Sequence, residues 1–215
     1  MKSTLSGHFL LWFVLAFPVV LRAQADIAHQ RGRRYFTSPD GLFRFEYSDS
    51  LVSCKRDPNQ ANWWVPDKSC EAYTPVCSNW SCDSSGTVAC VGYPANEMKG
   101  TNLQAAAFSV NERRKVTAES ECLRVEKPPP QIGTAHNETL NGIKFQAIEI
   151  DGIGLGNFIE GYVYRNFHNG MCYELDLRIA SSNIANFDPG TVKPFDSEKV
   201  KRALRAVLGS FRFIR

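Results

Sequence analysis

The sequence predicts an α+β domain in which a C-terminal helix packs across an antiparallel sheet. Two Asn-Gly pairs, Asn141-Gly142 and Asn169-Gly170, each separate two runs of strand character. Asn-Gly is the strongest short hairpin signal because both turn residues adopt positive φ. Apolar residues recur at helical spacing near the C-terminus, which predicts an amphipathic helix. Such a helix buries its apolar face by packing on the sheet.

The first residues have the parts of a secretory signal peptide. The apolar run LLWFVLAFPVVL spans 10–21, and Ala23-Gln24-Ala25 supplies a small-residue cleavage site. A membrane anchor is the alternative, but this run has twelve residues and contains Pro18, whereas a spanning helix needs about 20 apolar residues. We therefore expect residues 1–25 to be removed, no transmembrane anchor to remain, and the mature protein to be secreted or periplasmic.

A single domain is expected after the signal. The chain of 215 residues is 43% hydrophobic and has no internal repeat, which fits one ordinary domain. Residues 26–34 are polar and basic without periodicity and are predicted to be a flexible lead-in, so that the domain spans 35–215. Its first strand is predicted where Phe43, Phe45 and Tyr47 alternate with charged residues.

A cysteine-rich insertion is predicted at residues 54–94. The segment shows no strand or helix periodicity and mixes Pro, Asn, Asp, Ser and Gly with five of the seven cysteines. A structureless loop of this length is uncommon in a compact domain, so disulfide cross-links are the expected reason that it is tolerated.

The cysteines indicate disulfide bonds because exported proteins fold in oxidising compartments. No two cysteines are spaced Cys-x-x-Cys, which disfavours zinc-ribbon and thioredoxin-type sites; we expect neither a metal nor a cofactor. Their distribution favours a Cys122–Cys172 bond, two bonds within the insertion and one cysteine left over, and the other pairings stay open. The seven candidates are Cys54, Cys70, Cys77, Cys82, Cys90, Cys122 and Cys172.

The middle of the chain predicts a buried strand and a short helix. The apolar run at 103–110 is typical of a buried strand, and Thr117 could cap a helix over 118–125 whose first turn carries glutamates. Three prolines at 128–130 end that helix. The two hairpins that follow are expected to pair 134–140 with 143–150 and 161–167 with 171–179.

The C-terminal helix has one apolar and one basic face. Asp196 or Ser197 is the expected N-cap, Gly209 the expected end, and the closing SFRF fits a short strand. A basic amphipathic helix can contact a membrane or a partner, but a solvated basic face is the ordinary case. The apolar residues are Val200, Ala203, Leu204, Val207 and Leu208.

The order of these landmarks resembles the PsbP-like superfamily. The matching segments are GLFRFEY near the start, NGIKF and NGMCYEL at the two hairpins, and VLGSFRF at the end. The resemblance covers 35–47 and 134–213 and implies an α/β/α sandwich on a curled antiparallel sheet. It also implies a non-catalytic protein, since members are mostly accessory subunits, a small-GTPase release factor or exported proteins of unknown role. It transfers no functional residue, because fold alone does not determine function.

Two candidate sites follow from the residues. Four aromatic residues of the insertion could form a platform for a sugar or a peptide, although large aromatics more often fill small disulfide-rich cores. His168 lies four residues before Cys172 and could activate its thiolate, but a turn residue is expected to point into water and Cys172 has a plausible disulfide partner. The aromatic residues are Trp63, Trp64, Tyr73 and Trp80.

The charge balance does not indicate nucleic-acid binding. The formal net charge is +3, and removal of Lys2 and Arg22 with the signal leaves about +1, whereas nucleic-acid-binding domains concentrate basic residues. The carboxylates Glu149, Asp151 and Glu160 are interpreted as the solvated face of strands. The sequons at Asn79 and Asn137 mark surface positions if the chain passes through a eukaryotic secretory pathway.

The sequence therefore predicts an exported, non-catalytic domain that binds a protein partner or a small ligand. The alternative is a secreted hydrolase or thiol/redox enzyme with a site near His168, Cys172 and the loop 54–90.

Overall fold

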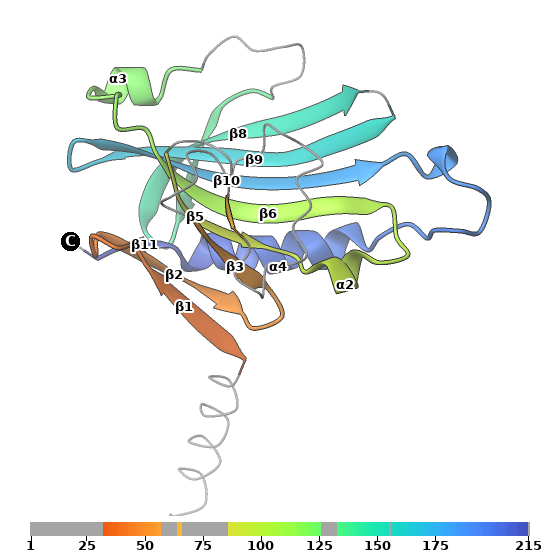
Figure 1. The fold of residues 1–215 in the computed structure, drawn as a ribbon. Helices are drawn as coiled ribbons and strands as arrows, with labels where there is room; N and C mark the ends of the chain where they lie inside the picture. The colour runs from red at the N-terminus through yellow and green to blue at the C-terminus, as the bar shows by residue number, and fades with distance from the viewer. Residues whose placement is uncertain (1–31, 57–63, 66–85, 126–132, 155, 215) are drawn as a thin grey trace, which may run out of the picture. The chain divides into compact units, whose positions relative to one another are not determined.

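The computed structural model describes residues 32–56, 64–65, 86–125, 133–154 and 156–214. Contacts divide the chain into two compact units, residues 1–33 and 34–215, and the second unit carries the fold (Figure 1). Its elements are β1 (Arg33–Thr37), β2 (Phe43–Ser48), β3 (Val52–Arg56), β4 (Trp64–Val65), β5 (Thr87–Gly92), α2 (Ala95–Met98), β6 (Leu103–Glu112), α3 (Glu119–Cys122), β7 (His136–Leu140), β8 (Ile143–Gly154), β9 (Asn157–His168), β10 (Met171–Ser182), the 3₁₀ turn η3 (Ile184–Asn186), α4 (Ser197–Ser210) and β11 (Arg212–Phe213).

The main sheet has eight strands in the order β4-β3-β5-β6-β10-β9-β8-β7, and its strand pairs are antiparallel. Both predicted hairpins are confirmed, with Asn141 and Asn169 at φ of 49° and 48° and glycine after each. β8 continues beyond the predicted residue 150 to Gly154, because the β8–β9 pairing extends to the Gly154–Asn157 pair.

A second, smaller sheet has the order β1-β2-β11. Helix α4 contacts β2 of the small sheet and β6 and β10 of the large one, as Figure 1 shows along the helix. The apolar side chains between these layers form one core. Within it, the Phe45 and Phe108 rings are 5.3 Å apart, and so are those of Phe43 and Phe211. The predicted α+β architecture, with a C-terminal helix across an antiparallel sheet, is thus confirmed.

Helix α4 begins as predicted and ends one residue later. The Asp196 carboxylate accepts a hydrogen bond from the Lys199 amide at 2.9 Å, which satisfies one of the free donors of the first turn. The expected end at Gly209 is wrong because Ser210 still belongs to the helix. The Ser210 hydroxyl bonds to Glu46 of β2, so tertiary contact extends the last turn.

Two segments that were expected to lack regular secondary structure contain strands. The lead-in was expected to reach residue 34, but β1 begins at Arg33. The insertion was expected to reach residue 94, but residues 87–92 form β5 between β3 and β6. β5 is almost wholly buried, so it shows no alternation of apolar and polar residues, and β1 is mostly exposed, so it shows none either.

The short helix before the prolines is smaller than predicted. α3 covers Glu119–Cys122, and its N-cap is Ala118, without a side-chain cap, rather than Thr117. Cys122 is fully buried and forms a disulfide bond with Cys172 of β10. The bond confirms the favoured pairing and ties α3 to the sheet face opposite α4. The prolines at 128–130 lie outside the described residues.

Candidate functional site

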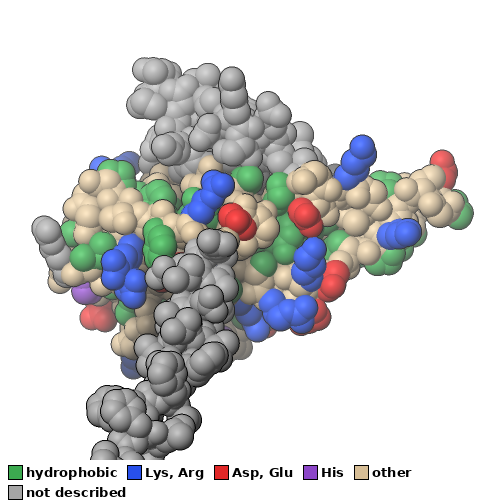
Figure 2. Space-filling model, turned by 90° about the horizontal axis from the view of Figure 1, so that it is seen from below, with side chains coloured by type: hydrophobic (Ala, Val, Ile, Leu, Met, Phe, Trp, Pro, Cys, Tyr) green, Lys and Arg blue, Asp and Glu red, His purple; other side chains and the backbone are tan. Residues whose placement is uncertain are grey.

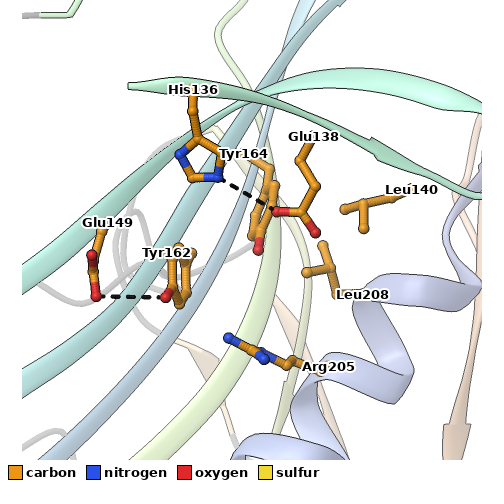
Figure 3. A pocket seen from close by; sticks show the side chains of 8 residues that line it. All are labelled: His136, Glu138, Leu140, Glu149, Tyr162, Tyr164, Arg205 and Leu208. Carbon is orange, nitrogen blue, oxygen red and sulfur yellow. Dashed lines mark hydrogen bonds and ion pairs between the residues drawn. The ribbon is translucent and has the colours of Figure 1, made fainter. Parts of the chain in front are cut away.

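A pocket of about 260 Å³ lies between one edge of the large sheet and the C-terminal half of α4 (Figure 3). Strands β7, β8 and β9 form one wall, and α4 forms the other. The residues that line it are His136, Glu138, Leu140, Glu149, Tyr162, Tyr164, Arg205 and Leu208.

Strand register brings the residues of the sheet wall together. His136 pairs with Ala147, which pairs in turn with Tyr164. In the next row Glu149 pairs with Tyr162. Because paired residues of adjacent strands point to the same face, all of these side chains face α4. Ala147 is small and fully buried, so the row places His136 and Tyr164 on either side of a short side chain.

The helix wall combines a buried leucine with an exposed arginine. Leu208 belongs to the core and is 2% exposed. The Arg205 guanidinium carbon lies 5.5 Å from the centre of the Tyr162 ring, within the range of a cation–π contact. Arg205 therefore lies over the aromatic floor of the pocket, as Figure 3 shows.

Tyr164 is held as a neutral hydrogen-bonding group. Burial raises the pKa of its hydroxyl well above the ordinary value, and the Glu138 carboxylate raises it further by charge and by a side-chain hydrogen bond. The Arg205 charge acts in the opposite direction but more weakly than Glu138. The Tyr164 hydroxyl is therefore protonated at neutral pH and can donate a hydrogen bond, with the Glu138 carboxylate as a neighbouring acceptor.

The remaining polar contacts of the sheet wall are long. The Tyr162 hydroxyl donates to Glu149 Oε1 at 3.5 Å, and His136 Nε2 lies 3.9 Å from Glu138 Oε2. Contacts of this length are weak. Both carboxylates can therefore exchange these contacts for contacts to a bound molecule.

The described residues hold no group of three or more His, Cys, Asp or Glu side chains that could bind a metal ion. Within the same residues, no helix is both long enough and apolar enough to span a membrane. On the face seen in Figure 2, Lys and Arg side chains lie beside Asp and Glu side chains rather than in one large basic patch.

The aromatic residues proposed as a platform fall outside the described side chains. Trp63, Tyr73 and Trp80 lie in undescribed segments, and only the backbone of Trp64 is described, as part of β4. Cys70, Cys77 and Cys82 are likewise undescribed, as is the side chain of Cys54. Cys90 is disulfide-bonded. Only the Cys122–Cys172 pairing is therefore resolved, and the other pairings stay predictions.

The His168 and Cys172 pair is not arranged as a thiol catalyst requires. The sulfur of Cys172 is bonded to Cys122. His168 is the last residue of β9 and stacks on Phe213, with ring centres 3.8 Å apart, so the expectation that it points into water is wrong. A final strand of two residues, which includes Phe213, supplies the ring that covers it.

The sequence did not identify the pocket. Glu149 was interpreted as part of a solvated strand face, and its side chain is exposed, but it lies on the face of β8 that is directed toward α4 and lines the pocket. Arg205 belongs to the basic face of the C-terminal helix, which was expected to be solvated. The alternation of His136, Glu138 and Leu140 beside a confirmed hairpin was the one local signal that placed these side chains on a common face.

The comparisons find neither a matching family model nor a matching curated protein. A chain from Bacteroides thetaiotaomicron VPI-5482 is similar in structure, with a TM-score of 0.45 and 8% identity over 85% of this chain and 48% of that one. This chain thus spans about half of its length. Cyanobacterial PsbP (CyanoP) from Synechocystis sp. PCC 6803 has a TM-score of 0.41 and 10% identity over 85% of this chain and 92% of that one. At these values neither similarity carries an inference about function.

Proposed function

We propose that this chain is an exported, non-catalytic domain of PsbP-like type that binds a small polar ligand in the pocket between β7–β9 and α4. The observation that carries the proposal is the convergence of acidic, basic, phenolic and imidazole side chains on one hollow with an aromatic floor. A concave site with a few convergent polar groups is the usual form of a small-molecule site.

Export is supported by the signal-like N-terminus and by the disulfide bonds. Cys122 is bonded to Cys172, and Cys90 is bonded as well, which is typical of chains that fold outside the cytosol. The proposed mature protein begins after residue 25, and its folded domain begins near β1.

Thermal unfolding with four small probes tests the proposal. The probes are L-leucine, isopentylamine, 4-methylpentanoate and glucose, which represent a zwitterion, a cation, an anion and a neutral polyol. A ligand that binds only the folded state stabilises it by RT ln(1 + L/Kd), where L is the free ligand concentration, so the Tm keeps rising with the logarithm of the ligand concentration above Kd. At least one probe is expected to raise the Tm of the wild-type mature protein with this logarithmic dependence on its concentration.

A matched pair of variants locates the effect. In Leu140→Trp the larger ring occupies the pocket, whereas Thr139→Trp places the same ring on the opposite side of the same strand, where the side chain is exposed. The Tm rise should persist in Thr139→Trp and disappear in Leu140→Trp. A rise that is equal in both variants, or no rise with any probe, contradicts the proposed site.

A further inference from the structure

The charges of the pocket are divided between its two walls. Glu138 and Glu149 are on the strands, and Arg205 is on the helix, as Figure 3 shows. With histidine counted as neutral, the pocket holds two negative groups and one positive group. A ligand that fits both walls must carry charges of both signs.

These charged groups contact aromatic and imidazole neighbours rather than each other. Among the described residues, neither glutamate forms an ion pair with Lys or Arg; Glu138 is 3.9 Å from His136, and Glu149 contacts the Tyr162 hydroxyl. Arg205 lies over the Tyr162 ring and, within the described part of the chain, has no carboxylate partner.

Other charges of the same helix behave differently. Lys199 pairs with Glu97 at 3.2 Å, and Lys201 pairs with Glu160 at 2.8 Å. The fold thus pairs these two lysines of α4 with carboxylates. The arginine at the pocket is kept over an aromatic ring with two carboxylates across the hollow, which leaves both kinds of charge open to a ligand.

The volume and the apolar lining of the pocket restrict the class of ligand further. A volume of about 260 Å³ lies just below the roughly 300–1,000 Å³ of common ligand pockets, so the occupant is a small molecule. Leu140 and Leu208 add an apolar surface to the lining. An aliphatic group of the ligand can pack there while its charged groups meet the two walls.

We infer that the ligand of this pocket is a small zwitterion of the α-amino-acid class, with its ammonium group at Glu149 and its carboxylate at Arg205, the two charged groups that both contact Tyr162. The inference rests on the proposed function and specifies its ligand. Arg205 is suited to this role because a guanidinium binds a carboxylate through two parallel hydrogen bonds.

Titration calorimetry with three matched probes tests the assignment on the mature protein. L-Leucine carries both charges, isopentylamine is leucine without the carboxylate, and 4-methylpentanoate is leucine without the ammonium group. Each lost charge removes charge-assisted hydrogen bonds, so each analogue is expected to bind about tenfold or more weakly than leucine.

Two charge-removing variants assign the groups. Arg205→Gln should weaken leucine and 4-methylpentanoate binding by about tenfold and leave isopentylamine binding unchanged. Glu149→Gln should weaken leucine and isopentylamine binding and leave 4-methylpentanoate binding unchanged. Arg202→Gln and Glu198→Gln are matched controls, because both residues are exposed on α4 outside the pocket lining, and neither should change any affinity.

The outcomes separate the ligand class from the site. If glucose or a singly charged analogue binds as tightly as leucine in a way that Leu140→Trp abolishes, the zwitterion is wrong and the pocket stands. If Arg205→Gln and Glu149→Gln weaken all three probes equally, the division of charge between the walls is wrong. If no probe binds, both the ligand class and the proposed function are contradicted.

Discussion

Asp176 is a carboxylate enclosed in the sheet. It is 1% exposed, and Arg178 of the same strand binds it through Nε–Oδ1 and Nη2–Oδ2 contacts of 2.8 Å each. Burial raises the pKa of Asp176 to about 6 in spite of the opposing Arg178 charge. Desolvation of the ionised form thus outweighs the attraction of the guanidinium.

This raised pKa makes the stability of the fold dependent on pH. The folded state binds the Asp176 proton more tightly than the unfolded chain does, so the contribution of this group is greatest below about pH 4. It declines as pH rises and levels off above the folded pKa of about 6. The whole change is about 3 kcal/mol.

Asp176→Asn should remove this dependence, because the amide resembles the protonated acid at every pH. The difference in unfolding free energy between the wild type and the variant, measured by urea denaturation, is expected to shift by about 2.5 kcal/mol in favour of the variant between pH 4 and pH 7. Asp151→Asn, at an exposed position in β8, should show no such shift. A constant difference for Asp176→Asn would contradict the raised pKa.

Gly161 allows close packing of β9 against β10. A Cβ at this position would overlap the carbonyl oxygen of Leu177, whereas a Cβ at Gly154 would meet nothing within 4 Å. Gly161→Ala should therefore lower the unfolding free energy by about 2–4 kcal/mol, and Gly154→Ala should change it by less than about 0.5 kcal/mol. If Gly161→Ala lowered the urea midpoint no more than Gly154→Ala, the close packing of β9 on β10 at Gly161 would not be required for stability.

At the scale of elements, α4 supports both the core and the pocket. Leu204 is fully buried between the two sheets, and Arg205, the next residue, reaches the pocket. Leu204→Ala is expected to cost about 2–5 kcal/mol, since it leaves a cavity in a packed core. The exposed Arg202→Ala should stay within about 0.5 kcal/mol. Chemical denaturation compares the unfolding free energies of the two variants. A small loss of unfolding free energy for Leu204→Ala would mean that the Leu204 side chain does not anchor α4 in the core.

Local signals explain which elements could be predicted from the sequence. The Asn-Gly turns and the N-cap Asp196 act within four residues, so their effects do not depend on the rest of the fold. Strand β5 depends on neighbours on both sides, β3 and β6, and its uniform burial removes the alternation by which strands are recognised. The end of α4 depends on a hydrogen bond to Glu46, which is 164 positions away.

At the scale of the molecule, the two faces of the large sheet have separate roles. The Cys122–Cys172 bond and its small cluster with Val116 lie on one face, and the main core and the pocket lie on the other. A covalent link on the first face should therefore stabilise the fold without affecting binding on the second.

Removal of that disulfide tests this separation. The double variant Cys122→Ser/Cys172→Ser should lose about 2–4 kcal/mol of unfolding free energy, because the bond closes a loop across a sequence separation of 50. Its leucine affinity at a temperature where it is folded should equal that of the wild type. If the folded double variant bound leucine more weakly than the wild type, the disulfide would be coupled to the binding site. That result would favour the thiol/redox enzyme over the non-catalytic binding domain.

The pocket itself could not have been predicted from local sequence patterns. Glu138 and Arg205 are far apart in the chain, and they face one hollow only because a hairpin edge and the C-terminal helix pack on the same side of the sheet. Each residue alone is typical of a solvated surface. Their juxtaposition follows from the tertiary fold, which neither helical nor strand periodicity encodes.

The most direct test of the account is the location of the bound ligand. L-Leucine is titrated into the ¹⁵N-labelled mature protein, and the amide resonances that move in a saturable way are assigned. These resonances are expected to fall in β7, β8 and β9 and in the C-terminal half of α4, and Leu140→Trp is expected to abolish their shifts. Saturable shifts centred on the sheet face that carries Cys122–Cys172, or no saturable shift, would contradict the proposed site.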